Sequence, residues 1–440
     1  MKKAYLLHTG YGKTKMCLDI IMRANKKPRV LLISTKKIVE NTWQAEINKW
    51  YKDQISYTYI TGDLTSKERL KRANMGTDIL GINTESIIWY LKNTTPVTRK
   101  TYRRTSVVEH HDGYELLDRF DLIILDEVSL FKNSQSERFK AIKRFTHKMK
   151  NVIALSASPT PKNIEDIWSI IYLLDGGKRL GTSITKFREN YAIAEPLFNG
   201  GNKYTYTTQS VDHILSLVKD IVVSEPEPAQ PLYPEPVLKK LVIKPDDKTS
   251  QMLKDFKQHF ILKLQGGKEV IALSKNQLIT KINQIASGSI YTQSTTEHLN
   301  DLKLRVLLNR LKDIDTPVLL IYHYVFDLEK LKQIPNARVL QDPQDFIDWN
   351  NNKVPIGILS PYSAAHGLNL QDSDCKHIFW FSPIWDTDKW IQTNARVCRR
   401  GQKNIVTIYV MLLKESYDEY AFNLCIEKFN TQNKILKKLK

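Results

Sequence analysis

Short runs of consecutive apolar residues recur through the first part of the chain, and longer segments with an amphipathic pattern separate them. Such near-continuous apolar runs are typical of strands that are buried on both faces of a parallel sheet. Strands that alternate with amphipathic helices predict an α/β lobe, which we expect to cover residues 1–195. The expected strands are residues 4–7, 30–34, 78–82, 122–125 and 152–155.

The same alternation returns near the end of the chain and predicts a second α/β lobe over residues 300–440. Its expected strands are residues 318–322, 356–359, 377–381 and 405–410. Residues 196–299 are expected to form a linker and helical region. Residues 192–208 predict a loop, the prolines between Pro226 and Pro236 favour extended chain, and residues 246–291 predict mostly helix. The fold class is therefore α/β, with two parallel-sheet lobes in tandem.

The charge balance adds a first indication of a partner. The 440 residues include 66 Lys and Arg against 47 Asp and Glu, which gives a formal net charge of +19. This excess favours a polyanion such as nucleic acid, because each neutralised phosphate releases counterions. A basic surface that serves only solubility is the alternative.

Cysteine usage and hydropathy bear on the compartment. The four cysteines form no CxxC pair, which argues against a disulfide framework or a zinc site and fits a reducing cytoplasm. No apolar run approaches the ~20 residues of a membrane span, and the apolar run at the N-terminus is too short for a signal peptide. We therefore expect a cytoplasmic protein with no membrane partner.

The clearest chemical motif follows the first apolar run, where a glycine-bearing loop leads into Lys13, Thr14 and an amphipathic helix. Glycines allow backbone N–H groups to curl around phosphates, and the helix N-terminus adds a favourable potential. Lys13 is expected at the β- and γ-phosphates and Thr14 at Mg²⁺. Leu7 stands where the usual motif has its first glycine. The predicted nucleotide-binding residues are Thr9, Gly10, Tyr11, Gly12, Lys13 and Thr14.

A second motif lies at the end of the apolar run 122–125, which delivers Asp126 and Glu127. Ligands of open α/β sheets bind at the carboxyl ends of the strands. Asp126 is expected to hold Mg²⁺ together with Thr14, and Glu127 to orient the attacking water. The combination predicts a nucleotide hydrolase.

The motifs together resemble those of the superfamily 2 helicases, and among them the Swi/Snf-like translocases of the compact bacteriophage and prophage type. Asp126-Glu127-Val128-Ser129 is similar to the DExx box of that family, and residues 41–50 are similar to its motif Ia with the ending Trp-x-x-Glu-x-x-Lys-Trp. The other matching segments are residues 82–85, 155–161, 173–188, 319–324, 359–370 and 392–402, the last with the Arg-x-Gly-Gln ending of motif VI.

This resemblance implies two RecA-like lobes with ATP and Mg²⁺ bound between them. The catalytic residues that it implies are Lys13, Asp126, Glu127, Gln392, Arg396 and Arg399, and it adds Gly367 to the nucleotide site. Arg396 and Arg399 are three residues apart, so on a helix they would share a face and could both reach a γ-phosphate. Nucleic-acid contacts are expected at Thr35, Lys36, Thr84, Ser360 and Asn369.

For several residues the sequence allows both a nucleic-acid contact and a purely structural role. The polar insertion 98–104, with Arg103 and Arg104, is either a hairpin that contacts DNA or a solvated loop. Trp43, Trp385 and Trp390 could stack on bases, but packing is the favoured interpretation. The family's glutamine-containing segment upstream of the P-loop has no counterpart here, so ATP as the nucleotide follows from the resemblance alone.

The function that the resemblance implies is a DNA-dependent ATPase motor. Its leading form is a double-stranded DNA translocase that remodels phage replication or recombination intermediates, works as a monomer when free and contacts the backbone of duplex or branched DNA. Replication or recombination proteins would be further partners, and the host bacterial cytoplasm the location. A strand-separating DNA or RNA helicase, or a nucleotide-gated DNA clamp with negligible turnover, remains as the alternative.

Overall fold

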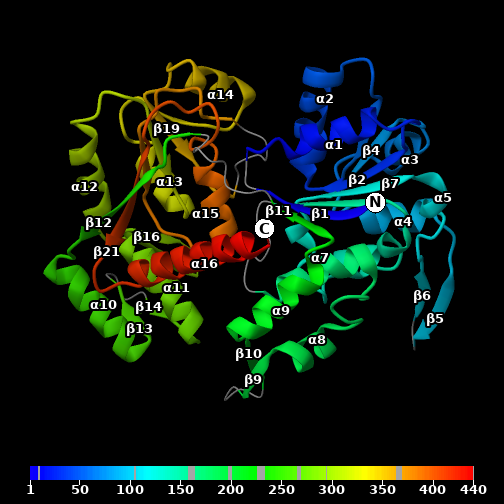
Figure 1. The fold of residues 1–440 in the computed structure, drawn as a ribbon. Coiled ribbons are helices and arrows are strands. Elements are labelled where there is room, and N and C mark those ends of the chain that lie inside the picture. Colours follow the sequence, from blue (N-terminus) through cyan, green and yellow to red (C-terminus); the bar gives the residue numbers. More distant parts are fainter. Residues whose placement is uncertain are drawn as a thin grey trace. The chain divides into compact units, whose positions relative to one another are not determined.

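The computed structural model describes residues 1–7, 10–103, 106–156, 164–196, 201–224, 233–264, 269–293, 295–362 and 369–439. The chain divides into two compact units. The first contains Met1–Pro226 and Asn430–Lys440, and the second contains Glu227–Ala364 and Leu368–Phe429. Each unit has its own parallel sheet with helices on both faces (Figure 1), which confirms the predicted α/β class.

The sheet of the first unit has the order β11-β1-β8-β7-β2-β4-β3 among the described residues, and every neighbouring pair is parallel. Its strands are β1 (Lys2–Leu6), β2 (Val30–Ser34), β3 (Tyr57–Ile60), β4 (Ile79–Asn83), β7 (Leu122–Asp126), β8 (Val152–Ser156) and β11 (Val222–Ser224).

Alternate residues of each central strand enter two different cores. In β2, Leu31 and Ile33 pack into one cluster, whereas Val30 and Leu32 pack into the other. Figure 1 shows α1 and α2 on one side of this sheet and α4 and α7 on the other. The helices of the unit are α1 (Lys13–Met22), α2 (Trp43–Tyr51), α3 (Ser66–Ala73), α4 (Ile87–Thr94), α5 (Leu116–Arg119), α6 (Glu137–Ile142), α7 (Asp166–Asp175), α8 (Ile184–Tyr191) and α9 (Thr208–Val218), together with the short turns η1 (Ile38–Thr42), η2 (Val128–Phe131) and η3 (Thr146–Lys148).

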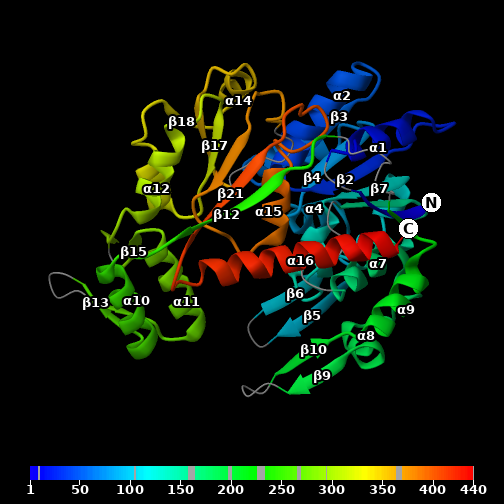
Figure 2. The ribbon, with the colours of Figure 1, turned by 60° about the vertical axis from the view of Figure 1, so that its left-hand side comes forward.

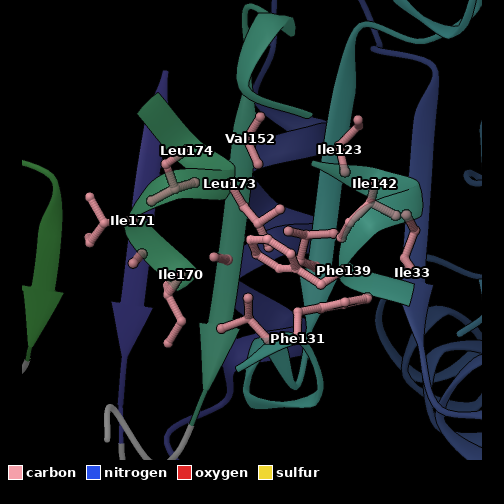
Figure 3. Packing of buried hydrophobic residues seen from close by; sticks show 14 of the residues in the cluster. Ile33, Ile123, Phe131, Phe139, Ile142, Val152, Ile170, Ile171, Leu173 and Leu174 are labelled. Carbon is pink, nitrogen blue, oxygen red and sulfur yellow. The ribbon is translucent and has the colours of Figure 1, made fainter. Parts of the chain in front are cut away.

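Large apolar side chains fill the core beneath α6 and α7. Figure 3 shows Phe139 beside Leu173 of α7, with Phe131 nearby, and all three side chains belong to one buried cluster. Phe131 and Phe139 are fully buried. Burial of a phenylalanine side chain contributes roughly 1.5–3 kcal/mol, so the burial of Phe131 helps to fix η2, which only Glu127 separates from the end of β7.

The sheet of the second unit has the order β12-β21-β20-β17-β19-β18 in the described part of the chain, again with parallel neighbours only. Its strands are β12 (Val237–Ile243), β17 (Val318–Ile321), β18 (Ala337–Val339), β19 (Ile356–Leu359), β20 (His377–Trp380) and β21 (Thr407–Leu413). Its helices are α10 (Asp247–His259), α11 (Lys275–Ala286), α12 (Leu302–Leu311), α13 (Val325–Leu331), α14 (Pro343–Asn350) and α15 (Thr387–Asn394).

Short antiparallel hairpins are attached to both units. The first unit carries β5 (Arg99–Arg103) with β6 (Ser106–His110), and β9 (Ile193–Pro196) with β10 (Asn202–Thr205), beside α8 in Figure 2. The second unit carries β13 (Ile261–Lys263) with β14 (Glu269–Ile271), and β15 (Ser289–Tyr291) with β16 (Thr296–His298). The predicted loop at 192–208 is therefore wrong where β9 and β10 pair, and the helical region 246–291 is interrupted by strands.

The structure divides the chain at other points than residues 195 and 299. β11 pairs with β1 in the first sheet, and β12 pairs with β21 in the second, so both ends of the expected linker belong to a sheet. The long helix α16 (Asp418–Lys438), red in Figure 2, begins in the second unit, and its last residues belong to the first. None of the helices within the described residues is long and apolar enough to cross a membrane.

A buried acidic side chain marks the start of α13. Asp327 is fully buried and accepts hydrogen bonds from the Ser382 hydroxyl at 2.8 Å and from the Tyr324 backbone N–H at 3.1 Å. Burial raises the pKa of Asp327 from 3.8 to about 6, although these bonds and the nearby Lys303 oppose the rise. The stabilising contribution of this group is therefore complete below pH 3.8 and is lost as the pH rises through 6.

We predict that Asp327→Asn, which is neutral at every pH, gains stability relative to wild type as the pH rises. The difference in the free energy of unfolding should grow by about 1 kcal/mol between pH 5 and pH 8 in urea titrations. Asp345→Asn is the matched control, because Asp345 occupies the same capping position in α14 but is partly exposed. A difference independent of pH would contradict the raised pKa.

Candidate functional site

The predicted site of the first unit lies at one edge of its sheet. β1, β2, β7 and β8 are parallel neighbours, so their carboxyl ends meet at the same edge. The Leu7 N–H, just beyond β1, donates to the Ser156 carbonyl at the end of β8 at 3.0 Å. The loop after β1 and the acidic end of β7 are thereby held at neighbouring positions.

The glycine-bearing loop leads directly into α1. Gly10 and Gly12 have φ of 90° and 72°, a region that favours glycine. Gly12 is the N-cap and supplies no side-chain hydrogen bond to the first turn of α1, and the N-terminus of a helix has a potential that favours an anion. Lys13 is the first residue of α1, and its ammonium donates to the Leu7 carbonyl at 3.0 Å.

Asp126, the last residue of β7, is a buried carboxylate with 7% exposure. The Trp43 indole N–H donates to Asp126 Oδ2 at 2.9 Å, and the Ser34 hydroxyl donates to the Asp126 carbonyl at 2.9 Å. Burial raises the pKa of Asp126, whereas the Trp43 bond, the charge of Lys13 and the Glu127 backbone N–H lower it. The sequence motifs at Lys13 and Asp126 are thus electrostatically coupled.

Glu127 follows with a left-handed backbone, at φ 57° and ψ 54°. A residue with a β-carbon rarely adopts this conformation, and such strain persists where the surrounding structure enforces it, often at functional sites. Glu127 is the single residue between β7 and η2 and the N-cap of η2, so this strained conformation lies where the strand ends and the 3₁₀ turn begins.

These residues fit a magnesium nucleotide. The described part of the chain contains no group of three or more His, Cys, Asp or Glu that could form an all-protein metal site. Mg²⁺ in nucleotide sites needs only one or two protein ligands, because phosphates and water supply the others. Thr14 on α1 and Asp126 on β7 would hold it, and when bound it would neutralise charge on the phosphates.

The expected nucleic-acid residues of this unit lie along the same edge. Thr35 and Lys36 follow β2, and Thr84 follows β4 with its N–H bonded to the Ser34 carbonyl at 2.9 Å. Thr35 Oγ1 is a buried atom without a hydrogen-bond partner, and Lys36 is exposed beside Asp63 at 3.3 Å. The Thr84 hydroxyl donates to Glu85 at 2.9 Å.

In the second unit, the structure brings together residues from separate motifs. Arg399 donates to the Asn369 side chain, and the Leu370 N–H donates to the Arg396 carbonyl at 3.0 Å. Arg396 has 6% exposure, and burial, with a smaller effect of Arg399, lowers its pKa to about 10, so it stays a cation at neutral pH.

One expectation about these arginines is wrong. α15 carries Gln392 but ends at Asn394, so Arg396 and Arg399 do not share a helical face. Both lie in the turns that follow, where the Cys398 N–H bonds to the Asn394 carbonyl at 2.8 Å. This turn and its hydrogen bonds to Asn369 and Leu370 hold the two arginines in place.

The remaining predicted residues are partly outside the described chain. Ser360 follows β19, is 7% exposed, and accepts a bond from the Tyr362 N–H at 3.2 Å. Arg103 is the last residue of β5. Thr9, Arg104 and Gly367 lie outside the described residues, as does most of the segment 155–161.

The glycine loop before α1 and the acidic pair at the end of β7, at one edge of a parallel sheet, define a P-loop nucleotide hydrolase. More narrowly, the chain belongs to the SNF2-related family of helicase-like ATPases, since the model of the SNF2-related domain matches residues 7–286.

Relatives of this chain include a phage protein and cellular proteins. Protein p41 of Acyrthosiphon pisum secondary endosymbiont phage 1 is 25% identical, over 98% of this chain and 93% of its own. The uncharacterized ATP-dependent helicase YqhH of Bacillus subtilis is 23% identical over 73% of this chain, and the DNA repair and recombination protein RAD54-like of Danio rerio is 22% identical over 93%. The aligned part is 60% of each of these two relatives.

A solved structure is also similar. The SWI2/SNF2 ATPase core of Sulfolobus solfataricus in complex with dsDNA aligns with 99% of this chain and 88% of its own, at 18% identity and a TM-score of 0.41.

Sequence reasoning missed two residues that bind Asp126. Trp43 was interpreted as a packing residue, and its burial agrees, but its N–H also binds the carboxylate. Ser34 was assigned only to a strand. The signal in the sequence is that Trp43 is the first residue of the Trp-x-x-Glu-x-x-Lys-Trp pattern, shortly after the predicted binding residues Thr35 and Lys36.

We predict different defects for the two halves of this site. Lys13→Ala removes the cation expected at the phosphates, so it should weaken nucleotide binding and lower hydrolysis at least 100-fold. Glu127→Gln keeps the shape but loses the carboxylate, so it should bind ATP normally and hardly hydrolyse it.

The measurements are equilibrium binding of a fluorescent ATP analogue and phosphate release. Lys15→Ala is the matched control for Lys13, because Lys15 lies on the same helix but pairs with Asp19. Wild-type turnover by Glu127→Gln would refute the assignment of this residue.

Proposed function

We propose that this protein is a DNA-dependent ATPase that translocates on double-stranded DNA. The observation that carries the proposal is the connection between β2 and α2. It contains Thr35 and Lys36, the expected DNA-backbone residues, and its two ends bind Asp126 through Ser34 and Trp43. The residues expected at the DNA backbone and the two groups that bind the expected magnesium ligand therefore lie on one short segment.

The net charge of +19 supports a polyanionic partner. The names of the relatives support DNA: one is a DNA repair and recombination protein, and two Arabidopsis thaliana relatives are CHD3-type chromatin-remodeling factors. Similarity to a phage protein over nearly the whole chain leads us to propose replication or recombination intermediates in a bacterial host as the substrate.

The chemical roles follow from the residues of the site. Lys13 and the N-terminus of α1 neutralise the phosphates, and Glu127 orients the attacking water. Arg396 and Arg399 of the second unit would stabilise the charge that develops on the γ-phosphate. Binding and loss of the nucleotide would then change the relation of the units and move the protein along the backbone.

A strand-separating helicase is the second candidate, because one feature favours it. The insertion between α4 and α5 is an antiparallel hairpin, β5 with β6, with Lys100 paired to Glu109 at 3.2 Å. A projecting hairpin with arginines in its first strand has the form of a wedge. The same hairpin would equally serve as a contact to duplex DNA.

We predict that Arg399→Ala lowers kcat for DNA-stimulated ATP hydrolysis by about 10³-fold or more, with nucleotide affinity nearly unchanged. Arg400→Ala is the control, because Arg400 is the exposed neighbour in the same turn. Equal kcat values for the two variants would remove Arg399 from the reaction. Absence of any DNA-stimulated phosphate release in wild type would favour a nucleotide-gated clamp.

We predict that the protein displaces a third strand from a triplex on intact duplex, in an ATP-dependent reaction, and opens a simple fork poorly. Both substrates can be tested with one preparation, and Glu127→Gln should be inactive on each. Fork opening without triplex displacement would instead identify a helicase. Loss of fork opening alone after deletion of residues 98–104 would identify the hairpin as the wedge.

A further inference from the structure

Trp43 has an unusual place among the buried tryptophans. It is the first residue of α2, it is fully buried between α1, α2 and the sheet, and its indole N–H donates to Asp126 Oδ2 at 2.9 Å. A buried indole N–H requires an acceptor. Here the acceptor is the carboxylate that is expected to hold Mg²⁺.

The backbone before Trp43 has a rare conformation that directs this side chain. η1 is a π-helical turn, and it closes with a hydrogen bond from the Trp43 N–H to the Ile38 carbonyl, five residues back. Such a turn contains one residue more than an α-helical turn, which rotates the following residues by about 100°. π-Helical turns are infrequent and are often found at functional sites.

The same connection holds Asp126 at a second point. The Ser34 hydroxyl at the end of β2 donates to the Asp126 carbonyl at 2.9 Å, so β2 and α2 fix both the backbone and the side chain of this residue. Among the described residues, the Lys13 charge and the Glu127 N–H also act on the carboxylate. The Trp43 indole N–H donates to one of its two oxygens, Oδ2, and a bond to one oxygen favours one rotation of the carboxylate.

We propose that Trp43 is a positioning residue, whose indole N–H orients the Asp126 carboxylate for the magnesium nucleotide. The inference rests on the proposed function, since it assumes that Asp126 meets the metal. Groups that orient a metal-binding carboxylate typically contribute 10–100-fold to metal affinity. A tryptophan that served only packing would leave the metal dependence of nucleotide binding unchanged when replaced by phenylalanine.

The matched control is another buried tryptophan of the same unit. Trp168 on α7 has 4% exposure, and its indole N–H donates to the Gly181 carbonyl at 3.1 Å, so it also loses one hydrogen bond on replacement by phenylalanine. Its ring packs against Phe139 and Tyr172. Both replacements remove one indole N–H. Trp43→Phe takes the donor from the Asp126 carboxylate, whereas Trp168→Phe takes it from the Gly181 carbonyl.

The experiment measures equilibrium binding of a fluorescent ATP analogue to the full chain while the free Mg²⁺ concentration is varied. For Trp43→Phe, the Mg²⁺ concentration at half-maximal effect should rise about tenfold or more, and the affinity without Mg²⁺ should stay within about twofold of wild type. Trp168→Phe should keep the wild-type value. Equal Mg²⁺ dependence in the two folded variants would overturn the proposal.

A second measurement keeps the proposal testable if Trp43→Phe does not fold. The wild-type chain is labelled with 5-fluorotryptophan, and the Trp43 fluorine resonance is assigned by elimination with phenylalanine variants of the other seven tryptophans. It should shift when Mg²⁺ is added to the nucleotide-bound protein, and an unchanged resonance would overturn the inference. Nucleotide binding by wild type that ignores Mg²⁺ would instead contradict the proposed function.

Discussion

The structure of the first unit depends on the hydrogen bonds and charges that compensate one buried carboxylate. Asp126 ends a strand that is covered on both faces, and its exposure is only 7%. A buried charge is costly unless hydrogen bonds and opposite charges compensate it. The compensation comes from the Trp43 N–H, the Lys13 charge and the Glu127 N–H. The P-loop helix, the β2–α2 connection and the strained turn at Glu127 therefore converge on this group.

The second unit also contains buried charges that require compensation. Lys303 and Asp418 form an ion pair at 2.7 Å with both side chains 1% exposed, and Asp418 also accepts the Leu413 N–H at 3.0 Å. Removal of one partner of such a pair is far more costly than the pair is favourable, because a lone charge then stays buried. The pair thereby fixes where β21 ends and α16 begins. Its role is structural.

The strands that sequence patterns predicted well are those buried on both faces. β2 and β19 match their predicted ranges, because a strand that is covered on both faces carries a nearly continuous apolar run, interrupted here only by Ser34 and Gly357. β12 was missed, since most of its residues are exposed at the sheet edge and two are lysines. β9 and β10 were taken for a loop for the same reason: a hairpin on the surface needs no apolar run.

Those parts of the candidate site that consist of short local motifs could be predicted from the sequence. Lys13 and Asp126 could be proposed because a P-loop and an acidic strand end are local patterns. The end of α15 at Asn394 could not be predicted, because the N–H groups of the following turn bind the last carbonyls of the helix, and no sequence pattern indicated that turn.

Trp43 shows the limit most clearly. Packing was the favoured interpretation of this tryptophan, and its burial agrees, yet the residue type says nothing about which acceptor the indole N–H meets. That acceptor lies 83 positions away in the chain. A phenylalanine could also be buried at this position, whereas the hydrogen bond to Asp126 requires the indole N–H.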